Sequence, residues 1–390
     1  MVTDHHQIAL MAVTGSRADW GLLTSPLALL RDDPTFKLIL VVTGQHLTPQ
    51  SKASLTEIGA DGFAVNAKID LCQRDTTVAG VAQGLAVAIA GFTDLFVRQR
   101  PDMLIVLGDR FEIFGAVQAA LLARIPVAHL CGGDVTEGAA DEAMRHAITK
   151  MSHLHFVTNA DAARRVRQMG EDPTHIYQVG SPGLDRVRKI APTSRRNFFG
   201  AIGLYPREKN AIVTFHPATL SENSEHQCGE LLAALNAFGP KLGLIFTGIN
   251  RDVSGDNLQQ MIDIFVASHD NAIAVPTLGT QGYISALTHA DFVIGNSSSG
   301  LYEAPSFCIP TVNIGDRQKG RLRAKSVIDC APERAAIEAA IETALARDCT
   351  GTINPYGDGS SSERIVAILK QIENPAGLLK KKFHLMERPV

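Results

Sequence analysis

Short runs of apolar residues alternate along the chain with longer stretches in which apolar residues recur at helical spacing. The short runs of the first half are rich in Val, Ile and Leu, which predicts buried strands of a parallel sheet. The stretches between them predict helices that cover both faces of that sheet. The expected strands are 8–13, 37–43, 103–107, 127–130, 155–157 and 176–179, and the expected helices include 20–31, 78–98, 111–123 and 141–151.

This alternation lapses between residues 181 and 210, where prolines, serines and basic residues cluster, and then it restarts. The pattern therefore predicts an α/β protein with two βαβ domains facing a central cleft. The expected boundaries are 1–182, a linker 183–209, a second domain 210–360, and a C-terminal helix 361–373 followed by a polar tail that contains Lys380, Lys381 and Lys382. The second domain's expected strands are 211–215, 242–246, 272–275, 292–295 and 311–314, and its expected helices are 225–237, 256–267, 282–289 and 332–347.

Length and composition agree with this organisation. The 390 residues suffice for two or three domains, and 45% hydrophobic with 20% charged residues is typical of a globular chain. The net charge of −3 argues against a nucleic-acid or membrane-surface binder, because both usually carry a basic excess. Six cysteines without a CxxC pair predict neither a disulfide framework nor a zinc ribbon, and favour the reducing cytoplasm.

No segment is predicted to cross a membrane. The best candidate, 80–97, is interrupted by polar residues and contains three glycines, so it is interpreted as a buried helix. The apolar stretch 8–13 is too short for a signal peptide, and no cationic segment precedes it.

Ligands of open α/β sheets bind beyond the carboxyl ends of the strands, and several reactive residues follow predicted strands in the first half. Arg17 lies in a Gly–Ser turn that could bind an anion, or it lies in solvent beside a helix capped by Asp19. Asp109 is either a general base or the N-cap of the next helix. His129 is interpreted as structural. Asp134 and Asp141 bring more acidic residues to this edge than helix capping requires.

In the second half, His216 ends a strand and is held by Pro217, which predicts an imidazole directed to the cleft. The turn 295–300 (GNSSSG) between a strand and a helix favours phosphate binding over simple capping, since one cap does not need three serines. Glu303, one turn into that helix, could accept both hydroxyls of a ribose or merely favour the helix dipole. Arg321 lies among alternating basic residues that either face a diphosphate or are solvated.

The sequence contains no HExxH, no clustered Cys/His set and no GxGxxG fingerprint. A mechanism without a metal or a dinucleotide cofactor is therefore expected.

Taken together, these motifs resemble the hydrolysing UDP-N-acetylglucosamine 2-epimerases of sialic and legionaminic acid synthesis. The matching stretches appear in family order over about residues 8–370, which implies the glycosyltransferase-B architecture of two Rossmann-like domains. They are 14–22 (TGSRADWGL), 107–112 (LGDRFE), 132–150, 215–217 (FHP), 295–300 (GNSSSG) and 315–321 (GDRQKGR).

The resemblance implies that UDP-GlcNAc loses UDP by elimination across C1–C2 and that water then adds to the 2-acetamidoglucal, giving N-acetylmannosamine. It implies a homodimer or homotetramer with no partner beyond the UDP-sugar. It assigns Asp109 and Asp141 to proton transfer, and His216 to the space beside the diphosphate and the sugar. The expected diphosphate ligands are Arg17, Ser297, Ser298 and Arg321, with Glu303 on the ribose and His46 at the sugar end.

One position departs from the family pattern. Relatives have glutamate or histidine where this chain has Cys131, and a neutral thiol is a poor base. Either Asp134 or Asp141 serves instead, or the substrate differs, as in relatives that act on UDP-N,N′-diacetylbacillosamine. A non-hydrolysing 2-epimerase, a retaining glycosyltransferase and a nucleotide-sugar sensor are the competing hypotheses.

Overall fold

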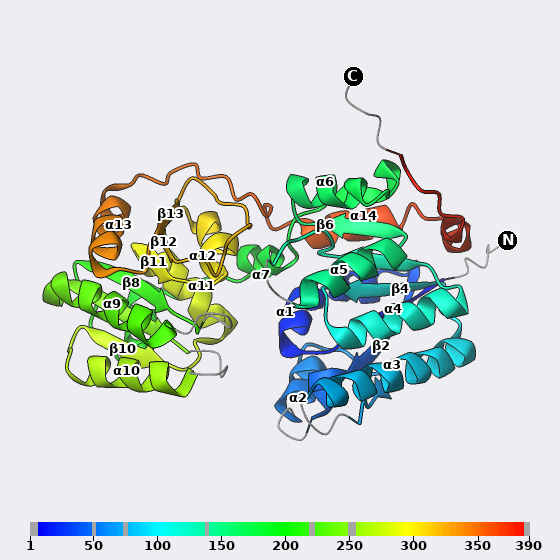
Figure 1. Cartoon of the computed structure of the whole chain (residues 1–390), viewed down its shortest axis with the longest axis horizontal. Helices are drawn as coiled ribbons and strands as arrows, with labels where there is room; N and C mark the ends of the chain where they lie inside the picture. The colour runs from blue at the N-terminus through cyan, green and yellow to red at the C-terminus, as the bar shows by residue number, and fades with distance from the viewer. Residues whose placement is uncertain are drawn as a thin grey trace. The chain divides into compact units, whose positions relative to one another are not determined.

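The computed structural model describes residues 7–48, 52–72, 77–136, 140–217, 223–248 and 255–385. The chain forms two compact units (Figure 1). Unit 1 comprises Met1–Arg186 and Tyr356–Val390, and unit 2 comprises Val187–Pro355. Unit 1 is therefore built from two separate segments of the chain.

Unit 1 contains a seven-stranded sheet in the order β3-β2-β1-β4-β5-β6-β7, and all of its pairs are parallel. The order reverses direction between β1 and β4, which in doubly wound sheets opens a ligand-binding crevice at the carboxyl edge. The strands are β1 (Ile8–Thr14), β2 (Phe36–Thr43), β3 (Ala67–Ile69), β4 (Met103–Leu107), β5 (Val127–Leu130), β6 (Leu154–Val157) and β7 (Ile176–Gln178).

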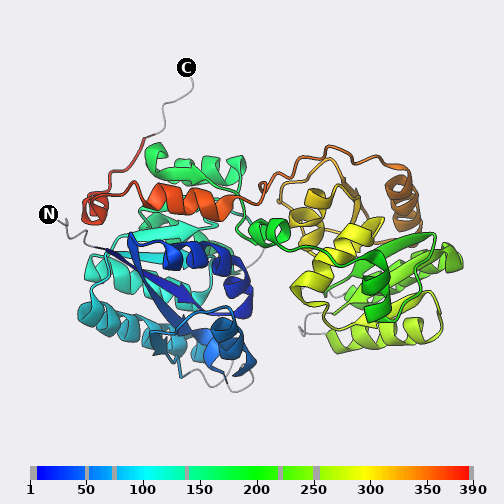
Figure 2. The ribbon, with the colours of Figure 1, turned by 180° about the vertical axis from the view of Figure 1, so that it is seen from behind.

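Helices bury apolar side chains on both faces of this sheet. On one face α1, α2 and α14 pack over Leu10, Leu40 and Phe156, and Figure 2 shows α14 beside α1 there. On the other face α3 and α4 pack over Met11 and Val41. The unit's helices are α1 (Arg17–Asp32), α2 (Lys52–Ala60), α3 (Val78–Gln99), α4 (Phe111–Ala123), α5 (Ala140–Met151), α6 (Ala160–Gln168) and α14 (Ser361–Leu369), with short 3₁₀ turns η1 (Gly44–Leu47), η3 (Pro173–His175) and η6 (Pro375–Leu379).

Unit 2 repeats the plan with a six-stranded parallel sheet in the order β10-β9-β8-β11-β12-β13. Its order reverses between β8 and β11. Helices α9, α10 and α13 cover one face, and α8 with α11 covers the other (Figure 2). The strands are β8 (Lys209–Thr214), β9 (Leu242–Thr247), β10 (Ala272–Val275), β11 (Phe292–Gly295), β12 (Thr311–Ile314) and β13 (Val327–Cys330). The helices are α8 (Arg195–Ile202), α9 (Ser224–Ala237), α10 (Gly255–Ala267), α11 (Gly279–His289), α12 (Ser299–Tyr302) and α13 (Arg334–Ala346), with η4 (Gly239–Lys241) and η5 (Ala304–Phe307); α7 (Gly183–Lys189) lies at the junction of the units.

The α/β class and both parallel sheets agree with the prediction, and three details differ. The segment 183–209, expected to be a linker, contains α7 and α8. The last helix ends at Leu369 instead of residue 373. Helix α3, interpreted as buried, has only one buried face: Phe92 is fully buried, whereas Val78 is 90% exposed. Among the described residues it is the one helix that is long and apolar enough to cross a membrane. Core helices of globular proteins often meet the same two criteria.

Candidate functional site

The reactive residues of unit 1 gather at the carboxyl edge of the sheet, beside the reversal between β1 and β4. Asp109 follows β4, and one of its oxygens accepts a hydrogen bond from the Arg145 guanidinium on α5. Arg145 also donates to the carbonyl of Asp134 at 2.8 Å. Arg110, not Asp109, occupies the N-cap of α4. The helix-cap alternative for Asp109 is thus wrong, because its side chain is paired across 36 residues.

Asp141 lies in the first turn of α5, on the same helix as Arg145. Loss of solvation, and then the negative charge of Asp109, raises the pKa of Asp141, while Arg110 and Arg145 act against this shift. A carboxyl group with a raised pKa exchanges protons more readily near neutral pH. The group of two aspartates and two arginines is therefore suited to proton transfer beside bound anionic groups.

His129 and Cys131, at the end of β5, are too deeply held for acid–base work. One ring nitrogen of His129 lies 2.8 Å from the Gly108 carbonyl and the other 3.2 Å from the Thr149 hydroxyl, and burial lowers its pKa to about 3. His129 thus joins β4 to α5 as a neutral imidazole, in agreement with its structural interpretation. Burial, followed by Asp134, raises the pKa of Cys131 far above its usual value, so the thiol stays protonated.

Asp134 lies in the loop that follows Cys131. Its Oδ1 accepts hydrogen bonds from Thr158 at 2.7 Å and from Asn159 at 3.4 Å. Both donors belong to the loop between β6 and α6, so the carboxylate is fixed from a neighbouring strand end.

Arg17 and His46 lie at the ends of β1 and β2 in different environments. Arg17 is exposed and pairs with Glu57 of α2 at 2.8 Å. His46 is buried between the Thr14 hydroxyl at 2.9 Å and the Ser54 hydroxyl at 2.5 Å, and burial lowers its pKa to about 4. The N-cap of α1 is Ser16, not Asp19.

In unit 2 the corresponding edge lies where β8 and β11 are neighbours. The His216 amide donates to the side-chain oxygen of Asn296 at 2.7 Å, and the Asn296 side-chain nitrogen donates back to the His216 carbonyl at 2.8 Å. Arg317 and Gln318 donate to the Asn296 carbonyl at 3.1 and 2.8 Å. This ladder ties the predicted His216 turn to the serine turn and to the basic loop.

The serine turn leads to a buried carboxylate. The Ser297 hydroxyl accepts the Ser299 amide at 3.4 Å, Ser298 is the N-cap residue of α12, and Tyr283 of α11 bonds the Ser299 hydroxyl. Helix α12 has only four residues, so Glu303 follows it as the C-cap and does not lie in its first turn. The helix-dipole alternative for Glu303 is therefore wrong.

The Glu303 carboxylate is poised for hydrogen-bond donors that the described residues do not provide. Its Oε2 is buried without a hydrogen-bond partner. Burial raises the pKa of Glu303 to about 7, although its bond with Ser299 lowers it. A carboxylate in this state gains much from two hydroxyl donors on a ligand.

Two further features belong to this part of unit 2. The Arg321 guanidinium lies 5.7 Å from the centre of the Tyr302 ring, one residue before Glu303, and donates to Gln318 at 2.6 Å. A cavity of about 550 Å³ lies at the carboxyl end of β10 and the start of α11, beside Pro276, Leu278 and Gln281. Tyr283 follows Gln281 and Gly282 of this cavity along α11, and its hydroxyl bonds the Ser299 hydroxyl.

The sequence did not identify Arg145, Asn296 or Tyr283 as parts of these groups. Arg145 lies within the matching stretch 132–150, but no spacing in the sequence indicates that it bonds to Asp109. Their roles depend on which strand ends become neighbours, which is a property of sheet order.

Comparison with known proteins identifies the family. The family model described as UDP-N-acetylglucosamine 2-epimerase matches residues 28–370, most of the chain. The chain belongs to the UDP-N-acetylglucosamine 2-epimerase family. The predicted resemblance is thereby confirmed.

Members of this family with curated names lie at moderate identity. A Legionella pneumophila protein named UDP-N,N′-diacetylbacillosamine 2-epimerase (hydrolyzing) is 34% identical, covering 95% of this chain and 98% of the relative. A Campylobacter jejuni protein named GDP/UDP-N,N′-diacetylbacillosamine 2-epimerase (hydrolyzing) is 34% identical, covering 81% and 83%. A Neisseria meningitidis protein named UDP-N-acetylglucosamine 2-epimerase is 31% identical, covering 96% and 98%.

Solved structures of the 2-epimerase family share the fold at lower identity. A Neisseria meningitidis UDP-GlcNAc 2-epimerase bound to UDP-GlcNAc superposes with a TM-score of 0.74 at 18% identity, covering 93% of this chain and 100% of that one. A Listeria monocytogenes protein described as a UDP-N-acetylglucosamine 2-epimerase reaches 0.78 at 17% identity, covering 94% and 96%.

Proposed function

We propose that this 2-epimerase is hydrolysing and converts UDP-GlcNAc and water to N-acetylmannosamine and UDP. The observation that carries the proposal is the pair of Asp109 and Arg145 at the carboxyl edge of unit 1, with Asp141 on the same helix as Arg145 and its pKa raised in part by Asp109. Binding of a nucleotide alone requires no such acidic group, whereas moving a proton at C2 of a sugar does.

Unit 2 supplies the nucleotide site in this proposal. Glu303 accepts the two ribose hydroxyls, which satisfies its unpartnered Oε2. Ser297, Ser298 and Arg321 bind the diphosphate through hydroxyl, amide and guanidinium donors, and His216 lies beside them on the Asn296 ladder. The cavity beside Pro276 offers room for the base.

Unit 1 supplies the chemistry at the sugar, with Arg17 as a further cation for the diphosphate. Asp141 accepts the proton from C2 as the C1–O bond breaks, so that UDP leaves and a C1=C2 double bond forms. Water then adds its oxygen to C1, and C2 takes a proton on the opposite face. Asp109 serves as the second carboxylate of these proton transfers, and Asp134 orients the sugar.

Departure of UDP must lead this elimination. The C2 proton is barely acidic in the ground state, and positive charge at C1 acidifies it. Carboxylates stabilise that positive charge while cationic and N–H groups stabilise the leaving diphosphate. The neutral Cys131 thiol and the buried His46 contact the sugar side without transferring protons.

A second candidate substrate is UDP-N,N′-diacetylbacillosamine. The Legionella and Campylobacter proteins at 34% identity carry this substrate in their names. The two sugars differ at C4 and C6, and the elimination chemistry at C1 and C2 is the same.

The products identify the activity directly. We expect incubation with UDP-GlcNAc to give UDP and N-acetylmannosamine. UDP-N-acetylmannosamine as the stable product would instead assign a non-hydrolysing 2-epimerase. An unchanged UDP-GlcNAc sample together with turnover of UDP-N,N′-diacetylbacillosamine would establish the second substrate.

Deuterium labelling tests the elimination itself. In D₂O the product should carry deuterium at C2, because the original C2 proton is lost and replaced from solvent. Proton NMR of the product observes C2 directly. A product that keeps its C2 proton after full conversion would refute the roles of Asp109 and Asp141.

We also propose that the enzyme acts in the cytoplasm, on the route to sialic-type sugars, as a homodimer or homotetramer. The outward face of α3 supports association, since no charged residue occurs between Val78 and Thr93 and Val87 is exposed. Light scattering of the purified protein measures the assembly, and a monomeric mass would contradict it.

A further inference from the structure

A buried carboxylate near the proposed proton-transfer group has no part in the steps above. Glu112 lies in the first turn of α4, three residues after Asp109, and its side chain is completely buried. Charged side chains are almost never buried unless they are paired. Its position therefore needs an explanation beyond the packing of α4.

Two glycines make room for this carboxylate. A Cβ atom on Gly15, which follows β1, would collide with the Glu112 carboxylate and side chain. A Cβ atom on Gly44, which follows β2, would lie 2.7 Å from Glu112 Oε1. The Glu112 carboxylate thus fills a slot between the carboxyl ends of three neighbouring strands, β2, β1 and β4.

One oxygen of Glu112 is paired and the other is not. Oε1 accepts from Arg110 Nε at 2.5 Å, whereas Oε2 is buried without a hydrogen-bond partner. Burial raises the pKa of the neighbouring Asp19 to about 6. The positive charge of Arg110 lowers this pKa, and the negative charge of Glu112 raises it. Glu112 is therefore the fixed negative charge against which Arg110 is oriented.

Arg110 also acts on the proposed proton-transfer group. Burial alone would lower the pKa of Arg110, but Glu112, Asp19 and Asp141 outweigh it. Arg110 in turn favours the ionised form of Asp141. The titratable and charged groups around Arg110 and Asp141 are Asp19 on α1, His46 on η1, Asp109 after β4 and Arg145 on α5.

We propose that Glu112 is a positioning residue of the 2-epimerase reaction, which anchors the Arg110 guanidinium so that it acts on Asp141. This inference rests on the proposed function for its effect on turnover. It explains why Gly15, Gly44 and the Arg110–Glu112 pair occur together, although they are far apart in the sequence. The alternative is that Glu112 only stabilises the start of α4.

The variant Glu112→Gln separates these roles, since it keeps the size of the side chain and removes its charge. We expect kcat to fall about 10- to 100-fold, as on loss of an outer hydrogen-bond partner of a functional group, with KM and UDP affinity nearly unchanged. Val117→Ala, a buried truncation on the same helix, is the matched control and should lower stability without changing kcat. Equal kcat values of wild type and Glu112→Gln would overturn the proposal.

A double-mutant cycle with Arg110→Met tests whether Glu112 acts through Arg110. If it does, adding Glu112→Gln to Arg110→Met changes kcat less than twofold further, because the orienting partner is already gone. Independent, multiplicative losses would show that Glu112 does not work through Arg110.

Carboxyl ¹³C NMR gives a readout without turnover, with Asp141→Asn identifying the Asp141 signal. Arg110 favours the ionised form of Asp141, so losing its anchor in Glu112→Gln should raise the pKa of Asp141. An unchanged or lower pKa of Asp141 overturns the inference even when turnover is measurable. Conversely, a wild-type protein that turns over neither UDP-sugar refutes the proposed function, while this titration still decides the role of Glu112.

Discussion

Asp141 is the single residue at which the proposed chemistry is tested with least structural disturbance, because Asp109 also holds Arg145. We expect Asp141→Asn to lower kcat by about 10²–10⁴-fold, the usual cost of removing a general acid or base. UDP affinity should stay near that of the wild type, since UDP is proposed to bind to unit 2. Steady-state kinetics and calorimetry with UDP provide the two measurements.

The neighbouring Glu142 offers the matched control for this prediction. Its carboxylate accepts the Thr136 amide at 2.6 Å, and Glu142→Gln keeps an acceptor oxygen there. Near-normal turnover is expected for this variant. Near-normal turnover of Asp141→Asn as well would remove Asp141 from the mechanism.

Glu303 in its ionised form lowers the stability of the fold, and its proposed role is to bind the ribose. Its pKa is about 7 in the folded protein against 4.5 for an unperturbed glutamate, so ionisation costs stability as the pH rises through 7. Each unit of pKa difference between the folded and unfolded states corresponds to at most about 1.36 kcal/mol of stability. We expect Glu303→Gln to stabilise the protein by about 2 kcal/mol at pH 8, which is less than this limit because part of the residue is solvated. The gain should vanish at about pH 3.5, well below the unperturbed pKa of 4.5, where the carboxyl group is neutral in both states.

The same Glu303→Gln substitution should weaken UDP binding about tenfold or more, since a charge-assisted bond becomes a neutral one. Urea unfolding at pH 8 and about pH 3.5, with calorimetry at pH 8, measures both effects. Glu342→Gln on the exposed side of α13 should change neither. Unchanged UDP affinity in Glu303→Gln would contradict the ribose assignment.

The sequence pointed to single residues more readily than to their partners. Asp109 stood out because it follows a strand at a polar loop, and Glu303 because it follows the GNSSSG turn; their roles in the reaction stay predictions. Arg145 was not predictable as the partner of Asp109, because 36 residues separate them and only the order β4-β5-β6 brings α5 to that edge. The burial of Glu112 was not predictable, because the room for its carboxylate is left by Gly15 and Gly44, which follow other strands.

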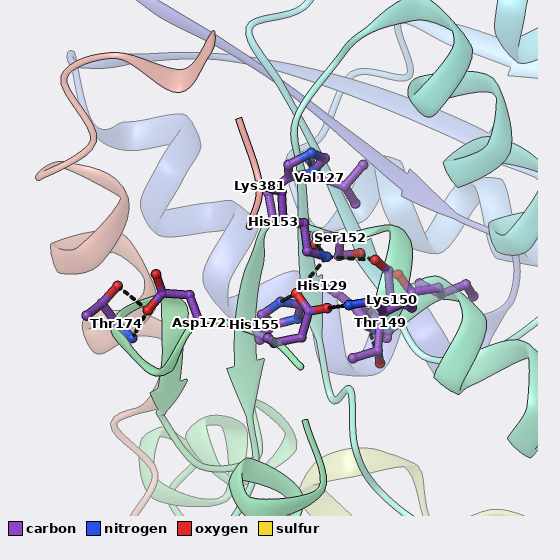
Figure 3. A network of polar contacts seen from close by, with 12 residues as sticks. Val127, His129, Thr149, Lys150, Ser152, His153, His155, Asp172, Thr174 and Lys381 are labelled. Carbon is purple, nitrogen blue, oxygen red and sulfur yellow. Dashed lines mark hydrogen bonds and ion pairs between the residues drawn. The ribbon is translucent and has the colours of Figure 1, made fainter. Parts of the chain in front are cut away.

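At the scale of elements, the carboxyl end of α5 is fastened by a lysine from the distant C-terminal segment (Figure 3). Lys381 donates to the carbonyls of Lys150 and Ser152 at 2.6 Å each and pairs with Glu171 at 2.6 Å. Glu171 also pairs with Lys150 at 2.7 Å and with His155 at 2.9 Å. The expected polar tail therefore contains one lysine that caps a helix and neutralises a buried acid.

We expect Lys381→Met to cost about 2 kcal/mol, because two backbone carbonyls and a buried carboxylate lose a charged donor. Burial would raise the pKa of Glu171, but His155, Lys150 and Lys381 hold it at about 2. Because this pKa lies below the unperturbed 4.5, the stabilisation is present above pH 4.5 and is lost as the pH falls toward 2. The difference between variant and wild type should shrink over the same range in urea unfolding.

The adjacent lysines give the controls for this experiment. Lys380 and Lys382 are exposed, and their Met variants should stay within about 0.5 kcal/mol of wild type. Equal losses in all three variants would show that the charge of the tail matters and the Lys381 contacts do not.

The elements that the sequence missed have weak patterns for a physical reason. Strand β3 has three residues and lies at the edge of its sheet, and β13 includes the exposed Asp329 at the edge of the other. Neither of these two strands has a fully buried residue, so their hydrophobic signal is weak. The central strands β4, β5 and β12 are fully buried, and their predicted bounds match or nearly match those observed.

At the scale of the whole molecule, both units use one strand order and place their polar groups at the reversal of that order. This part of the fold was predictable, because continuous apolar runs separated by helices require parallel, doubly covered sheets. That residues 356–390 belong to unit 1 was not predictable from periodicity. It depends on the burial of Ile365 and Leu369 of α14 against unit 1, and on one buried carboxylate, that of Asp185.

Asp185 joins the two segments of unit 1. It is fully buried and accepts the Ser361 amide at 2.9 Å and the Ser362 amide at 2.6 Å, the first amides of α14. We expect Asp185→Ala to cost about 3 kcal/mol, because these donors lose a charged acceptor and α14 loses its anchor. Hydrogen exchange should then accelerate in β1 and β4 of unit 1, while β8 and β11 of unit 2 keep their protection. Asp358→Ala, which breaks the exposed pair with Arg364 and one bond from the Ser360 amide, should leave both sets of amides protected. Equal acceleration in both units would contradict this prediction, because it would mean that the two units open together and that α14 stabilises the whole chain and not unit 1 alone.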